Sequence, residues 1–130
     1  SAQVCVTELK ADSVSLQLFN EKKWRELLEF GKSTLAEGAD FPLLRMRTGY
    51  AAFVLENYSE SLKHYEKAYK DDHENNIALY YAYLNNVYLN NSMAARFYAG
   101  KMTDENRATE NLKNTKISSL SLEYSFNHRA

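Results

Sequence analysis

Residues 75–91, NNIALYYAYLNNVYLNN, restrict the possible folds more than any other stretch of the chain. They include four tyrosines and six asparagines but no charged residue. Apolar residues recur at helical spacing, yet a helix on the surface of a globular protein needs a polar face, which this one nearly lacks. The stretch is too short and too rich in asparagine for a transmembrane helix, which needs about 20 mainly apolar residues. We therefore expect a helix that other helices bury on most sides, with asparagines capping its ends.

Helices also account best for the rest of the chain. Its 130 residues suggest one domain, and with one proline and four glycines it has few residues that would interrupt a helix. Apolar side chains recur at helical spacing in a series of segments separated by short polar turns. The helical patterns cover residues 13–19, 21–37, 42–56, 58–70, 75–91, 92–102 and 103–114.

The helical segments repeat with a period of about 34 residues, which is typical of stacked helical pairs. Moving the chain by one period places Trp24 on Tyr58 and Gly49 on Tyr83. In such a stack each repeat contacts its neighbours. We predict that Gly49 lies where two helices approach closely. We also predict that Trp24 and Tyr58 are mostly buried at equivalent places in successive repeats.

The segment Pro42–Asn75 has a pattern that is known from a protein family. It combines small residues at Gly49 and Ser61, aromatic rings at Tyr58 and Tyr65, and an alanine at Ala68. In these positions it resembles the tetratricopeptide repeat. It departs from the family at Arg45, Ala52 and His73, where the family usually has tryptophan, tyrosine and proline.

The resemblance extends more loosely over residues 8–108 and implies an all-α fold. The implied architecture is a right-handed solenoid of about three helix pairs. We expect an N-terminal segment over residues 1–12, the helical domain over residues 13–112, and a C-terminal tail over residues 113–130. Within the tail, apolar and polar side chains alternate over residues 117–126, which predicts an extended β-strand.

The same resemblance implies a function in protein–protein interaction. Family members act as scaffolds, so we expect a non-catalytic domain that binds a peptide or a segment of a partner protein in its concave groove. By the family's geometry, the groove is lined by Met46, Tyr50, Phe53, Tyr80, Leu84 and Tyr88. An alternative is that these side chains pack on one another or on a terminal segment. The basic clamp of chaperone-binding members, which holds a terminal carboxylate, is not visible.

Nothing in the sequence indicates catalysis, a cofactor or a metal. There is no glycine-rich phosphate loop, no assignable Ser-His-Asp set and no pair of carboxylates in an apolar setting. The run 71–74, DDHE, is interpreted as a solvated turn, because adjacent residues cannot easily converge on one metal. His64 is expected on the surface. Cys5, the single cysteine, is expected to be an inert thiol.

Charge and hydropathy exclude two classes of partner. Sixteen basic and seventeen acidic residues give a formal net charge of −1, so neither nucleic acid nor an anionic membrane is expected as a partner. No segment of the chain is predicted to span a membrane. The opening residues, SAQVC, are typical of a sequence that follows signal-peptide cleavage. This favours an exported, periplasmic protein, with a cytoplasmic protein as the alternative.

The strand pattern of residues 117–126 suggests a second function. Its alternation resembles a strand of an outer-membrane β-barrel, with one face toward lipid and one toward the lumen. The alternative function is therefore a structural periplasmic domain attached to such a barrel, with no ligand of its own. In the isolated chain, the backbone groups of this strand need partners. We expect the strand to pair with the same segment of a second copy, which forms a homodimer, or to fold back along the helices.

Overall fold

Helices joined by short turns make up the part of the chain that the structure, a computed structural model, describes. This part comprises residues 2–102, and for residues 2–6 only the backbone is described. Six helices follow one another within it: α1 (Ala2–Asn20), α2 (Trp24–Ala36), α3 (Pro42–Val54), α4 (Tyr58–Asp71), α5 (Asn76–Tyr88) and α6 (Ser92–Lys101). The expected all-α fold is confirmed over these residues. The helical pattern at 103–114, the tail at 113–130, its strand at 117–126 and the side chain of Cys5 lie outside the described residues.

The first helix is longer than its sequence pattern predicted. We expected it to begin near residue 13, but α1 begins at Ala2, so a boundary after residue 12 falls inside a continuous helix. The sequence from Ser1 to Asn20 contains no glycine or proline that would interrupt it. Ala11 and Ser15, which lie one helical turn apart, are both buried, so the packed face of α1 extends beyond the predicted start. A search for apolar residues alone does not detect this face of α1, because the buried Ser15 forms part of it.

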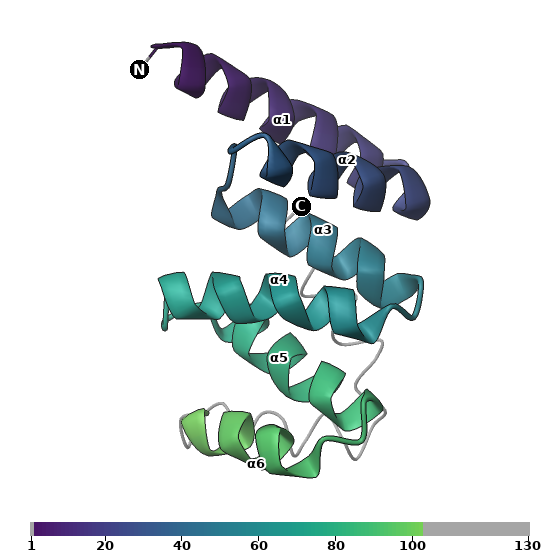
Figure 1. Cartoon of the computed structure of the whole chain (residues 1–130), viewed down its shortest axis with the longest axis vertical. Coiled ribbons are helices and arrows are strands. Elements are labelled where there is room, and N and C mark those ends of the chain that lie inside the picture. Colours follow the sequence, from purple (N-terminus) through teal and green to yellow (C-terminus); the bar gives the residue numbers. More distant parts are fainter. Residues whose placement is uncertain (1, 103–130) are drawn as a thin grey trace.

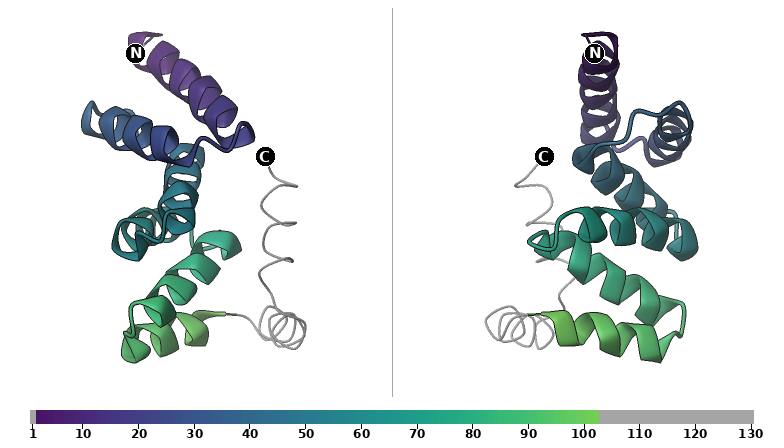
Figure 2. Two further views of the ribbon diagram at one scale, coloured as in Figure 1. Left: turned by 90° about the vertical axis from the view of Figure 1, so that its right-hand side faces the viewer. Right: turned by 60° about the vertical axis from the view of Figure 1, so that its left-hand side comes forward.

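The helices stack into an elongated array in which each helix packs against the next (Figure 1). Helix α1 also packs against α3, so the first pair contacts the second through both of its helices. We call α1, α3 and α5 the first helices of the pairs, and α2, α4 and α6 the second helices. Figure 2 (left) shows α1 and α5 on one side of the stack and α2 and α4 on the other.

The turns inside the pairs repeat with the period of the sequence. Lys22, Glu56 and Asn90 are spaced by one period, and they are the residues other than glycine that have a positive φ in the described part, at 57°, 60° and 59°. In each turn the next N–H donates to a carbonyl five residues earlier, in the pairs Lys23 to Leu18, Asn57 to Ala52 and Asn91 to Asn86, at 3.0, 2.8 and 2.9 Å. This hydrogen bond and the left-handed residue before it define the same helix-terminating motif three times.

Small residues let neighbouring helices approach closely. A Cβ atom on Gly49 would lie 2.8 Å from a ring carbon of Tyr65, which confirms the predicted contact between α3 and α4. A Cβ atom on Gly31 would overlap the Thr48 side chain, so α2 and α3 also approach each other closely. These distances are below ordinary van der Waals contact, so each glycine is required by packing.

Helix α5 shows how the uncharged asparagine-rich stretch is accommodated. Asn85 and Asn86 are buried in this helix, and their amides donate to the carbonyls of Tyr81 and Ala82 one turn earlier, at 2.9 and 2.8 Å. Asn85 also donates to the Ser61 hydroxyl of α4 at 2.9 Å. Asn75 caps the start of α5 by accepting from the Ala78 N–H. The asparagines therefore satisfy backbone and neighbouring groups where a charge would have remained unpaired.

Candidate functional site

The three first helices place apolar side chains at equivalent positions. Translation by one period relates Leu9, Leu43 and Ile77, then Leu16, Tyr50 and Leu84, then Phe19, Phe53 and Val87, and finally Val54 and Tyr88. We call the surface formed by these residues the first-helix stripe. Exposed apolar groups concentrate on it. Of the eight large hydrophobic side chains that are exposed in the described part, five belong to the stripe, with exposures between 38% and 66%.

The base of the stripe is built from contacting aromatic rings. At the first pair, Trp24 contacts Phe19 and Tyr50 edge-on, with ring centroids 5.5 and 5.4 Å apart. At the second pair, Tyr58 contacts Phe53 edge-on at 5.7 Å and stacks on Tyr88 at 4.6 Å.

Trp24 and Tyr58 thus occupy equivalent places, as predicted. Each opens a second helix and packs between the phenylalanine of its own first helix and a tyrosine of the next. Both residues are only partly exposed, with most of their surface buried, as predicted.

The predicted groove residues lie at different depths in this surface. Met46 and Tyr80 are buried, so they lie beneath the exposed surface of the stripe. The backbone carbonyl of Met46 accepts a hydrogen bond from the Tyr65 hydroxyl at 3.2 Å. Tyr50, Phe53 and Leu84 are partly buried. Tyr88 is 51% exposed and lies at the surface. The alternative that the rings pack on one another holds for the faces that the aromatic contacts cover, while other parts of the stripe remain exposed.

Sequence analysis missed four exposed members of the stripe, namely Leu9, Leu43, Val54 and Val87. The signal that could have found two of them is the period itself. Val54 lies one period before Tyr88, and Val87 lies one period after Phe53, and both of these partners were candidates.

The first-helix stripe is electrically almost neutral. Asp12 is a charged residue of α1, and it lies at the position equivalent to Met46 of α3. Its carboxylate accepts from Arg47 Nη1 at 2.6 Å, and the same nitrogen lies 3.0 Å from the Ser15 hydroxyl. Arg47 is itself buried, so this ion pair joins α1 to α3 and leaves little free charge beside the stripe.

His64 is buried, with 1% of its surface exposed, so the expectation of a surface histidine is wrong. Its Nε2 lies 2.7 Å from a Glu60 carboxylate oxygen, and its Nδ1 lies 3.1 Å from Nη1 of Arg45. A guanidinium can only donate, so Nδ1 accepts, and a neutral ring with its proton on Nε2 satisfies both contacts. Burial lowers the pKa of His64, the hydrogen bond to Glu60 opposes that shift, and the nearby charge of Arg45 reinforces it.

Arg45 joins Asp40 and His64 into one polar network. Its guanidinium forms two hydrogen bonds with Asp40, at 3.0 and 2.8 Å, besides the contact with His64. The Arg45 hydrogen bond holds the pKa of Asp40 below its usual value. A polar network therefore surrounds Arg45, and α4 supplies the histidine that completes it.

The side chains of residues 7–102 include no group of three or more metal-ligand residues placed to hold one ion. None of the six described helices has the length and hydropathy needed to cross a membrane.

The geometry defines an all-α protein of stacked helical pairs. Comparison with known proteins adds no relative, since no protein-family model, no curated protein and no solved structure matches the chain.

Proposed function

We propose that this protein is a non-catalytic interaction domain that binds a peptide or a segment of a partner protein on the first-helix stripe. The observation that carries the proposal is the clustering of exposed apolar side chains at repeat-equivalent positions of the first helices. Exposed apolar side chains that gather on one set of helices often mark an interaction site, whereas single scattered ones are normal. In the family that the sequence resembles, the same helices line the concave groove.

The chemistry of the stripe indicates what kind of peptide it would take. Apolar and aromatic side chains dominate it, and its aromatic members are held by ring contacts with the second helices. Rings fixed in this way lose little conformational entropy on binding. The tyrosine hydroxyls can exchange hydrogen bonds with a peptide backbone. The partner is therefore a segment that offers apolar side chains at intervals and needs no charge for recognition.

A peptide-display selection tests the proposal on the full chain. A random library of short peptides is selected on the immobilised protein, and the recovered peptides are then measured against variants by fluorescence anisotropy. We expect Leu43→Glu and Tyr88→Glu each to weaken binding at least tenfold, because each places a charge within the apolar contact. Both side chains are about half exposed, and thermal melts of the two variants check that the fold is retained.

The matched control is Met93→Glu. Met93 is the most exposed large hydrophobic residue of the described part, at 83%, and it lies on α6, outside the stripe. Its replacement should leave the affinity unchanged. The proposal fails if recovered peptides bind the two stripe variants as tightly as they bind the unchanged protein.

The alternative function is a structural domain attached to a β-barrel in the outer membrane. It is favoured by the alternating pattern of residues 117–126, which lie outside the described residues. It requires no ligand on the stripe, so the peptide selection separates the two proposals. Recovery of peptides that depend on Leu43 and Tyr88 supports the interaction domain.

A further inference from the structure

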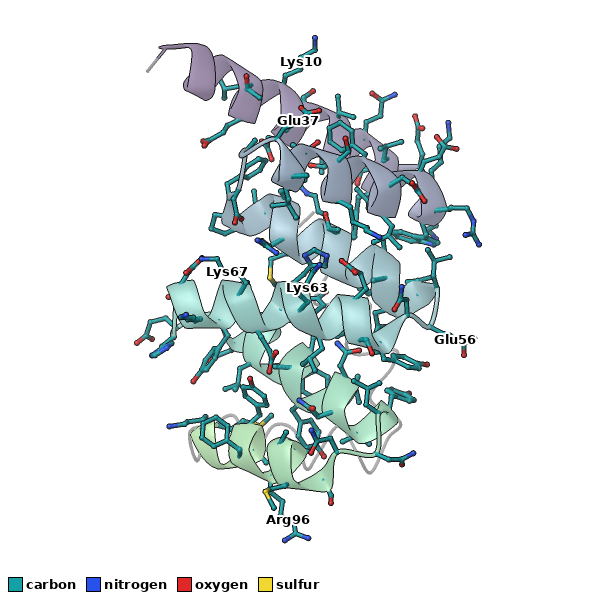
Figure 3. All side chains as sticks on the ribbon, viewed as in Figure 1. Lys10, Glu37, Glu56, Lys63, Lys67 and Arg96 are labelled. Atoms are coloured by element: carbon teal, nitrogen blue, oxygen red, sulfur yellow. The ribbon has the colours of Figure 1, made fainter. Side chains whose placement is uncertain are left out.

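A second surface feature lies between two second helices and involves none of the stripe residues. It is an open pocket of about 470 Å³, lined by Lys32, Leu35 and Ala36 of α2, by Arg45 of α3, and by Lys63, His64 and Lys67 of α4. Every lining residue that can carry charge is basic. Figure 3 shows Lys63 and Lys67 along α4. Four cationic side chains thus surround one concavity, and Leu35, Ala36 and His64 form its remaining walls.

The floor of the pocket is pre-organised. The Arg45 side chain is 15% exposed, and its two hydrogen bonds to Asp40 and its contact with His64 fix the guanidinium in place. The lysines at the rim are held less firmly. Lys63 pairs with Glu60 at 3.3 Å, and Lys67 pairs with Asp71 at 2.9 Å. Exposed pairs of this kind contribute little stability, so the lysines can turn toward another anion at small cost.

Simple charge counting gives the site a net positive charge. Lys32, Arg45, Lys63 and Lys67 contribute four positive charges, and their partners Asp40, Glu60 and Asp71 contribute three negative ones, which leaves +1 with a neutral His64.

The next junction of second helices shows that this pocket is not a by-product of the repeat. Translation by one period replaces Lys32 with Glu66, Leu35 with Tyr69, Lys63 with Phe97 and His64 with Tyr98. There the Tyr98 hydroxyl donates to Glu66, and the ring of Tyr98 contacts those of Tyr69 and Phe97. The equivalent positions therefore carry contacting rings and a carboxylate, with Lys70 and Lys101 as their basic residues. The first junction has four cationic side chains and no carboxylate at these positions, whereas the second has two cationic side chains and one carboxylate.

We propose that the pocket between α2 and α4 binds an oxyanion, either a phosphate group or a carboxylate. Both offer oxygen acceptors to lysine donors, and hydrogen bonds between ionised partners are stronger than those between neutral ones. The site lies on second helices, so it can be occupied while the first-helix stripe holds a peptide.

Amide chemical-shift titration of the full chain tests the site. Inorganic phosphate and acetate are the two probes, each added at constant ionic strength by replacing sodium chloride. We expect saturable shifts on α2 and α4 near Lys32 and Lys67. Tighter binding of phosphate would identify a phosphate group as the ligand, and tighter binding of acetate would identify a carboxylate.

Charge-removing variants decide whether the pocket is responsible. Lys32→Gln and Lys67→Gln should each weaken binding by about fivefold, the upper end of what one exposed charge pair contributes. The matched control is Lys101→Gln, because Lys101 is the equivalent of Lys67 one period later and sits over the Phe97 ring at the second junction. It should leave the affinity unchanged. Shifts that do not saturate, or an equal loss of binding in the Lys101 variant, would overturn the proposal.

Discussion

His64 shows how one residue can combine a polar side chain with a fully buried position. Its ring is neutral because Glu60 accepts from one nitrogen while Arg45 donates to the other. Protonation of Nδ1 would place a second donor against the guanidinium, and Lys63 adds a further positive charge nearby. The buried network therefore depends on the protonation state of a single group.

This arrangement predicts a loss of stability in mild acid. The pKa of His64 is lowered in the folded protein from 6.5, so the unfolded chain binds the proton more readily. Its contribution is fully present above about pH 6.5 and is lost as the pH falls toward the folded pKa, with a slope of at most about 1.4 kcal/mol per pH unit. Urea unfolding between pH 7.5 and 5 measures it. A His64→Gln variant should lose this slope, whereas a change at the exposed His73 should keep it. Equal slopes in all three proteins would contradict the prediction.

Gly49 carries a second prediction at the residue scale. Because a Cβ atom there would already meet the Tyr65 ring at 2.8 Å, leucine overpacks the contact between α3 and α4. Gly49→Leu should lower the free energy of unfolding by about 1–3 kcal/mol, the usual cost of overpacking. Thermal melts measure the change. The control is Gly100→Ala, since no atom lies within 4 Å of a Cβ at Gly100. Coincident melts of the Gly49 variant and the unchanged protein would rule out the close contact.

At the scale of elements, the turn inside each pair is a repeated unit with its own local chemistry. Lys22, Glu56 and Asn90 hold the left-handed conformation at the end of each first helix. Asparagine tolerates this conformation better than most residues, while lysine and glutamate are strained in it. Asn57 and Asn91 then cap the following second helices by accepting from the N–H groups of Glu60 and Ala94. In the second and third turns, a left-handed residue therefore ends the first helix, and the asparagine that follows it caps the start of the second helix.

The strain at Glu56 can be relieved by substitution. Glycine adopts a positive φ without steric cost, although it also gains entropy in the unfolded chain. The first effect, about 1–2 kcal/mol, exceeds the second, so Glu56→Gly should stabilise the protein by roughly 0.5–1 kcal/mol. Denaturant unfolding measures the change. The same substitution at Glu60, which lies inside α4, should instead destabilise it. A destabilised Glu56 variant would show that its side chain contributes more than its backbone costs.

At the scale of the whole molecule, Tyr81 joins the second repeat to the third. Its buried ring stacks on Tyr65 of α4 at 4.6 Å and meets Tyr50 and Phe53 of α3 edge-on, at 6.1 and 5.1 Å. In a linear stack each repeat contacts only its neighbours, so stability depends on such interfaces one by one. The Tyr81 ring is therefore a major contact between the second and the third repeat.

Removal of this ring should uncouple the end of the array. Tyr81→Ala should cost about 3–5 kcal/mol, as large aromatic truncations in a core do. Hydrogen exchange should show the protection of α5 and α6 falling more than that of α2 and α3. Phe97→Ala, which truncates a ring that is 58% exposed, should change stability by less than about 0.5 kcal/mol. A uniform loss of protection along all the helices would indicate one cooperative unit instead.

The sequence by itself determined the local features of this protein. The helical segments, the repeat period, the close contact at Gly49 and the asparagine caps follow from spacing and from residue preferences within a few turns of the chain. Only the tertiary structure decided which side chains of the first helices are exposed, that α1 extends back to Ala2, and that His64 is buried. These outcomes depend on partners from distant segments, such as Arg45 beside His64 and Tyr65 beneath Met46. A periodic pattern marks the face of a helix, but the neighbouring helix determines how deeply each residue on that face is covered.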